Sequence, residues 1–228
     1  MKRSPRGLPP HTPLATLHAH AIDGTMTILA IDTSTARGSV ALLVDGAMRL
    51  DETFTADRSH SASLFAVLER ARGLVTTIDL VAIGLGPGSY AGVRIAIAAA
   101  MGLELGLGAR LVGVPSVAAL ETDAPRYLAI GDARRETFYF TRVEEGVCAE
   151  GPLLATAEEL RERLAALADW PVFAPAPLAA FPQVVVALPM AARLARLAAQ
   201  DRGIVARGDL EPLYLREPYI TQPKAISR

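Results

Sequence analysis

Continuous apolar runs and helical spacing alternate over the first half of the chain. The runs at residues 27–31, 80–85 and 110–114 are typical of buried strands. Two more strand patterns, 38–44 and 48–55, flank Asp45-Gly46, a typical two-residue hairpin turn. Helical spacing predicts one helix from Ser59 or Ser61 to about Arg72, with one apolar face made of Leu64, Phe65, Leu68 and Ala71. A second helix is predicted from about Ala91 to Leu107, and Ser116 begins a short one, so the order is β-β-β-α-β-α-β-α.

The second half of the chain shows a reduced form of the same order. Strand patterns occur at residues 127–130, 137–143, from 147 onward, and at 184–186, the last as a buried strand. Helices are predicted at 157–168 and 190–199, followed by a short ordered segment at 212–216. Periodicity therefore predicts an α/β protein with mixed sheets in two half-domains, the second smaller, divided between Glu121 and Pro125. The expected units are an N-terminal extension without order (1–25), a first half-domain (26–122) and a second one (123–228).

Composition narrows the function classes. The 228 residues carry a net charge of -1, which excludes a nucleic-acid binder that works by bulk charge. Cys148 is the single cysteine, so neither an internal disulfide nor a cysteine-based zinc site can form. Of the four histidines only His60 follows Met26, which excludes a three-histidine metal site in the predicted folded part. His60 is interpreted as a polar residue at a helix start rather than a general base. Trp170–Ala192 lacks charge, but its five prolines argue against a membrane span.

The turn Asp32-Thr33-Ser34 has two interpretations. An acidic residue after the first strand, next to a polar turn, is where actin-type enzymes hold a metal-bound phosphate. The same residues also form turns in which Asp and Thr bond to their own backbone. No second phosphate loop is recognisable in the other half of the sequence.

The segment Gly86-Pro87-Gly88-Ser89 leads into the second helix, which continues through Gly92 and Arg94. Ser89 is placed to cap this helix, and a glycine-rich turn before a helix can bind an anion. No Gly-Lys-Ser/Thr sequence follows, which excludes a Walker-type loop. The helix is apolar on nearly all sides, which predicts that one side lies in the core and another in a protein interface.

These motifs occur together in a known family. The sequence resembles TsaB (YeaZ) in Ile28–Thr35, Ser39–Leu42, His60, the Gly86–Arg94 segment, Gly113-Val114 with Ser116, Asp132–Glu136 and Pro212–Arg216. The resemblance is strong over residues 27–140 and weaker beyond. Ala91 departs from the family pattern, which has threonine there.

The resemblance implies an actin-like, ribonuclease H-like fold and a subunit that is not itself the catalyst. It implies pairing through the first half-domain with TsaD, the catalytic subunit that makes N6-threonylcarbamoyladenosine on tRNA, together with the ATPase TsaE. ATP and threonylcarbamoyl-adenylate would be used by partner subunits, so no cofactor or metal is expected on this chain. In isolation it would form a homodimer, in the cytoplasm and without a membrane. The interface candidates are Leu64, Leu68, Ala91, Val93, Ile95, Ala98, Ala99 and Gly102, and Ala98→Glu or Ala99→Glu is expected to break the pairing and leave the fold.

One enzyme hypothesis remains as the alternative, and a second is rejected. A small actin-type ATP-binding kinase or hydrolase would use Asp32 as its metal-phosphate ligand, with Thr33 and Ser34 holding phosphate. A metallopeptidase is excluded by the resemblance, because Ser116 and Leu120 stand where the TsaD pattern has its two metal-binding histidines.

Overall fold

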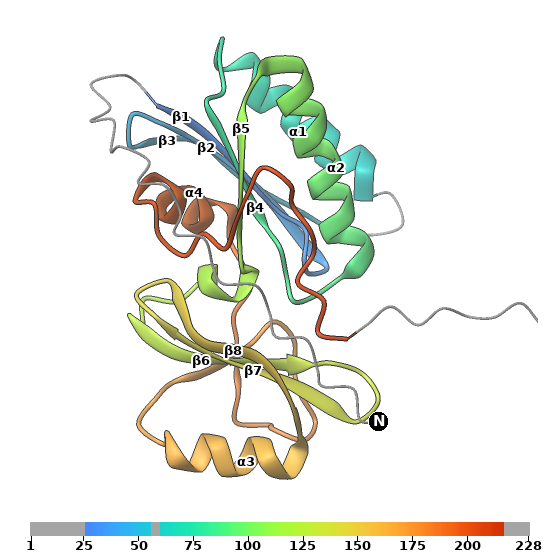
Figure 1. The fold of residues 1–228 in the computed structure, drawn as a ribbon, viewed down its shortest axis with the longest axis vertical. Helices are drawn as coiled ribbons and strands as arrows, with labels where there is room; N and C mark the ends of the chain where they lie inside the picture. Colours follow the sequence, from blue (N-terminus) through green and yellow to red (C-terminus); the bar gives the residue numbers. More distant parts are fainter. Residues whose placement is uncertain (1–25, 56–59, 217–228) are drawn as a thin grey trace, which may run out of the picture.

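A computed structural model describes residues 26–55 and 60–216. The expected N-terminal extension (1–25), Ser59 and the side chain of His60 lie outside what it describes. Two sheets, one above the other in Figure 1, form the body of the molecule. The first has the strand order β11-β5-β4-β1-β2-β3 and the second the order β10-β9-β6-β7-β8.

The first sheet is mixed and is built around β1 (Thr27–Asp32), whose six residues are all buried. β1 pairs antiparallel with β2 (Arg37–Val44) and parallel with β4 (Leu80–Gly84), and β4 pairs parallel with β5 (Arg110–Val114). β2 and β3 (Ala47–Thr55) form the expected hairpin, with φ of 51° at Asp45 and 77° at Gly46. Positive φ at both turn residues matches the right-handed twist of the strands, so this dipeptide sets their register.

Helices cover both faces of the first sheet. α1 (His60–Gly73) and α2 (Tyr90–Leu107) lie side by side on one face, and α4 (Ala191–Ala199) lies on the other (Figure 1). Leu29 and Ile31 of β1 pack in the cluster below α1 and α2, whereas Ile28 and Ala30 pack in the cluster that contains α4. Successive residues of a strand point to opposite faces, so one short apolar run serves two cores.

The second sheet is covered by one helix on its outer face. α3 (Ala157–Ala166) begins with a capping box between Thr156 and Glu159, and its Leu160 packs with Leu128, Ile130 and Phe140. The inner face carries Tyr127, Ala129 and Tyr139, which join the core cluster of α4, so the two halves share apolar packing.

The remaining elements of the chain are η1 (Ser116–Ala119), β6 (Arg126–Asp132), β7 (Thr137–Glu144), β8 (Val147–Thr156), β9 (Val172–Ala174), β10 (Val185–Val186) and β11 (Ala206–Arg207).

The structure corrects two expectations about the second half. The segment 184–186 is not a buried strand: β10 lies at a sheet edge, and both of its valines are exposed. The expected unit 123–228 also does not belong to one half, because α4 packs on β1 and β2 and β11 pairs with β5. The amphipathic α4 buries its alanines and leucines against the open face of the first sheet, which the preceding helices leave uncovered.

Candidate functional site

The turn after β1 directs its polar groups into the protein. Asp32 Oδ1 accepts hydrogen bonds from the Ser34 amide at 2.9 Å and from Ser34 Oγ at 2.7 Å. Thr33 Oγ1 donates to the carbonyl oxygen of Gly92 at 2.7 Å. All three side chains are buried. The candidate phosphate ligands therefore bond to their own turn and to the start of α2, which is the second of the two interpretations of this sequence.

The glycines of the Gly86–Gly92 segment allow α2 to approach that turn closely. A Cβ on Gly88 would lie 2.1 Å from the carbonyl oxygen of Ser34, and one on Gly92 would lie 2.0 Å from that of Thr33. The Ser89 amide donates to the Ser34 carbonyl at 2.6 Å, and Ser89 Oγ caps the helix by accepting from the Gly92 amide at 3.2 Å. The glycines therefore permit close packing of the helix start on the turn.

Burial controls the charge of Asp32. It raises the pKa of this carboxyl above the ordinary 3.8, and the nearby hydroxyls of Ser116 and Ser34 oppose the change only in part. The Ser116 hydroxyl also accepts from the Gly86 amide at 2.9 Å. A Cβ on Gly84 would lie 1.9 Å from Asp32 Oδ2 and 2.6 Å from Ser116 Oγ, so both side chains pack against the end of β4.

We expect the raised pKa of Asp32 to make the folded state less stable as pH rises. Above pH 3.8 the unfolded chain loses this proton while the folded chain keeps it, so stability falls until the pH passes the folded pKa. Each pH unit in that interval costs about 1.4 kcal/mol. Asp32→Asn keeps an acceptor for Ser34 and removes the titration, so the fall should disappear. Urea denaturation between about pH 4 and pH 8 measures it. Asp51→Asn, at an exposed position of β3, is the matched control and should keep the fall; an Asp32→Asn variant that also keeps it would contradict the assignment.

Four of the eight interface candidates lie in the core of the chain itself. Leu64 and Leu68 of α1, and Val93 and Ala99 of α2, are buried in the cluster between these helices and the sheet. They cannot form a surface, since their side chains already pack against β1, β2 and β4. Ala91, Ala98 and Gly102 are exposed and Ile95 is half-buried. Phe65, expected on the packed face of α1, is 55% exposed.

Exposed apolar residues that the sequence did not single out extend this surface. On α2, Met101 is 52% exposed and Leu105 is 87% exposed. They follow Ala98 at helical spacing, so the outward side of α2 is apolar from Ala98 to Leu105, with the exposed Arg94 one turn before it on the same side. We call the exposed set on these two helices the α1/α2 face: Phe65, Ala91, Ala98, Met101, Gly102 and Leu105. Helical periodicity places these residues on one side of α2. Because α2 is apolar on nearly all sides, however, periodicity cannot show which side faces the solvent.

α2 is long and apolar enough to cross a membrane. Its inner side, however, packs on the first sheet through Val93, Ala96, Ile97 and Ala100, and Ser89 and Gly108 cap its two ends. It is thus a packed helix of an α/β fold with one apolar side left open.

A cleft of about 690 Å³ separates the two halves on the side of the α2 N-terminus. Ser34, Pro87 and Ser89 line it from the first half, and Asp132 and Tyr139 from the second. The segment 212–216 forms a further wall, where the Leu213 amide donates to the Leu85 carbonyl at 2.9 Å. The sequence predicted this segment as ordered, and the structure gives it a place between the halves.

The remaining candidate residues are buried side chains and a single thiol. Ser116 and Leu120 are buried, and within the described residues no three His, Cys, Asp or Glu side chains come together as metal ligands. Burial raises the pKa of the Cys148 thiol to about 12, which keeps it protonated at neutral pH.

Comparison with known proteins identifies the family that this chain resembles. The family model described as TsaD, tRNA N6-adenosine threonylcarbamoyltransferase, matches residues 54–174. TsaB of Escherichia coli, described as a tRNA threonylcarbamoyladenosine biosynthesis protein, is 36% identical over 135 residues, or 54% of this chain and 58% of that one. A Mycobacterium tuberculosis protein is 32% identical over 200 residues, or 84% of this chain and 92% of that one. The match thus spans little more than half of the Escherichia coli relative.

A solved structure shows the same architecture. YeaZ from Pseudomonas aeruginosa superposes with a TM-score of 0.64 at 28% identity, covering 77% of this chain and 91% of that one. Together with the two mixed sheets, this likeness confirms the actin-like, ribonuclease H-like fold expected from the sequence.

Proposed function

This chain belongs to the TsaB/YeaZ family of tRNA threonylcarbamoyladenosine biosynthesis, and from that premise we propose that it is a non-catalytic subunit that pairs with TsaD and activates it. The observation that carries the proposal is the α1/α2 face, because large apolar side chains exposed on two neighbouring helices are typical of a protein interface. Ala98 and Gly102 are small residues one turn apart, so they leave room for a partner helix to approach.

The family model supports the choice of partner. It describes a threonylcarbamoyltransferase, and the residues it matches include both helices of the α1/α2 face. A transferase with the same elements would present an equivalent helix pair, and two equivalent faces pack around a twofold or pseudo-twofold axis. In the absence of TsaD, the same geometry favours a homodimer.

The remaining parts of the proposal come from the family. Asp32 and Thr33 form hydrogen bonds within the protein, and Ser116 and Leu120 supply no imidazole, which supports assigning the chemistry to the partner. TsaE, ATP, threonylcarbamoyl-adenylate and tRNA would enter through the complex, in the cytoplasm. Activation would consist of holding TsaD in its competent conformation, which is a shift of population rather than a contribution to the reaction.

Size-exclusion chromatography with light scattering tests the pairing. The chain alone is expected to elute as a homodimer, and with the TsaD of the same organism as a complex containing one copy of each. Threonylcarbamoyladenosine formation by the mixture, compared with TsaD alone, tests the activation. A chain that stays separate from TsaD, or a mixture no more active than TsaD alone, would refute the proposal.

Binding of Mg-ATP to the isolated chain tests the enzyme alternative. A kinase or hydrolase should bind the nucleotide with measurable heat and gain thermal stability, whereas the hydrogen bonds that engage Asp32 and Thr33 within the protein lead us to expect neither.

A further inference from the structure

Tyr90, Tyr214, Arg216 and Arg134 line the cleft between the two halves of the molecule, and Arg94 lies against Tyr90. The guanidinium of Arg94 lies 5.3 Å from the ring centre of Tyr90, and its Nη1 donates to the Tyr90 hydroxyl at 2.8 Å. The Tyr90 and Tyr214 rings are 5.6 Å apart. Two residues later, Arg216 Nη2 contacts the carbonyl oxygen of Arg134 at 3.4 Å and the hydroxyl of Thr137. We call Arg94, Tyr90, Tyr214, Arg216 and Arg134 the arginine–tyrosine strip.

The strip is open to solvent, and Asp132 lines the same cleft. Tyr90 is 54% exposed and Tyr214 is 44% exposed, and the three arginines are also exposed. Within the described residues none of these arginines forms an ion pair, whereas Arg70, Arg163 and others pair with carboxylates elsewhere on the surface. Exposed aromatic rings between unpaired guanidinium groups are the combination that binds bases and phosphates of unpaired nucleic acid.

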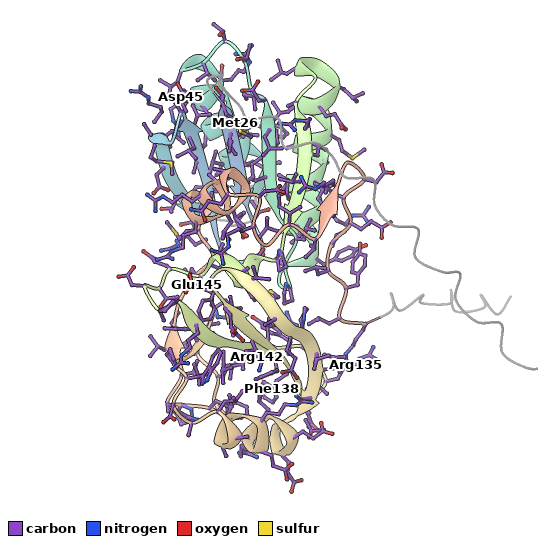
Figure 2. All side chains as sticks on the ribbon, turned by 60° about the vertical axis from the view of Figure 1, so that its left-hand side comes forward. Met26, Asp45, Arg135, Phe138, Arg142 and Glu145 are labelled. Atoms are coloured by element: carbon purple, nitrogen blue, oxygen red, sulfur yellow. The ribbon has the colours of Figure 1, made fainter. Side chains whose placement is uncertain are left out.

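The turn that carries Arg134 is held in an unusual conformation. Arg134, Arg135 and Glu136 all have positive φ, at 67°, 53° and 61°. Asp132 Oδ1 accepts from the Arg134 amide at 2.7 Å, and the Thr137 amide donates to the Arg134 carbonyl at 3.2 Å, so the turn is fixed. Figure 2 places Arg135 at the end of the second sheet beside the segment 212–216, and Glu145 at the opposite end. Left-handed backbone at three successive non-glycine residues is costly and is found where a side chain must be presented.

We propose that the arginine–tyrosine strip binds the tRNA substrate of the complex, with Arg94, Arg134 and Arg216 on phosphates and with Tyr90 and Tyr214 stacked on unpaired bases. This inference rests on the proposed function, which makes tRNA the substrate. The net charge of the chain is -1, so the contact is local to the strip. The cleft beside it, about 690 Å³, has room for one unstacked nucleotide.

Titration of fluorescent tRNA tests the strip, with the chain alone and with the TsaD complex, between about 50 and 200 mM salt. Replacing both Arg94 and Arg134 by Gln is expected to weaken binding and to lower the slope of log affinity against log salt by about 2. Arg110→Gln, at the opposite end of β5 from the cleft, is the matched control and should leave the slope unchanged. Tyr214→Leu is expected to weaken binding at least about fivefold, and Tyr214→Phe to restore it, because the ring and not the hydroxyl stacks.

The outcomes separate this inference from the proposed function. Light scattering shows whether each variant still pairs with TsaD. Variants that pair normally with TsaD and bind tRNA like the wild type, both alone and in the TsaD complex, would overturn the proposed tRNA site and leave the subunit assignment intact. Loss of tRNA affinity with intact pairing supports the strip. If AMP stabilises the wild-type chain but not the double variant, while tRNA binds both equally, the strip serves a free nucleotide and the RNA proposal is wrong.

Discussion

Ala98→Glu is expected to prevent self-pairing of the isolated chain and to weaken its binding to TsaD at least about 100-fold, with the fold unchanged. Ala98 is exposed near the middle of the α1/α2 face, so the new carboxylate has full hydration in the free chain. On pairing it would be buried against apolar side chains without a partner, which costs several kcal/mol. Light scattering measures the mass and titration with TsaD measures the affinity. Circular dichroism and urea denaturation should match the wild type.

Two comparison variants make this result specific. Ala165→Glu adds the same charge at an exposed position of α3 and should pair normally. Ala99 is only 7% exposed and packs in the core below α1 and α2, so Ala99→Glu is expected to destabilise the fold itself by about 3 kcal/mol or more. The sequence alone predicted the same effect for both substitutions, because it does not distinguish the buried alanine from the exposed one. Normal pairing by Ala98→Glu would show that the α1/α2 face is not the interface.

Gly92→Ala is expected to destabilise the chain by about 3 kcal/mol or more. The added Cβ would lie 2.0 Å from the Thr33 carbonyl oxygen, which is backbone and cannot rotate away. Relief requires α2 to move off the turn after β1, breaking the hydrogen bonds that hold the helix start there. Urea denaturation gives the change in unfolding free energy, and a lower midpoint without a change in slope would show that the native contact is what was lost.

Gly102→Ala is the control in the same helix. Nothing lies within 4 Å of a Cβ at Gly102, so alanine should stabilise the chain by about 0.5–1 kcal/mol through helix propensity. Gly102 lies on the α1/α2 face, and measurement at two protein concentrations therefore separates the stability of the monomer from any effect on pairing. Equal stability of Gly92→Ala and the wild type would remove the close-packing explanation of the glycine motif.

The sequence by itself determined the features that depend on neighbouring residues. Asp45-Gly46 determined a hairpin and Ser89 caps α2. The β-β-β-α-β-α-β order is as predicted, and the short helix expected from Ser116 is the 3₁₀ turn η1. The family was also evident from short motifs in a fixed order. These properties are local, since strand and helix periods and turn preferences extend over only a few residues.

Only the tertiary structure decided which side of each element meets which neighbour. Leu64 and Phe65 are adjacent, yet one is buried in the core and the other is exposed, and the same holds for Ala99 and Ala98. The bond between Thr33 and Gly92 spans 59 residues and the contact between Arg134 and Arg216 spans 82. The return of α4 and β11 to the first sheet is of the same kind. Such contacts form because the whole chain must cover its apolar faces at once, and no short window of sequence contains that condition.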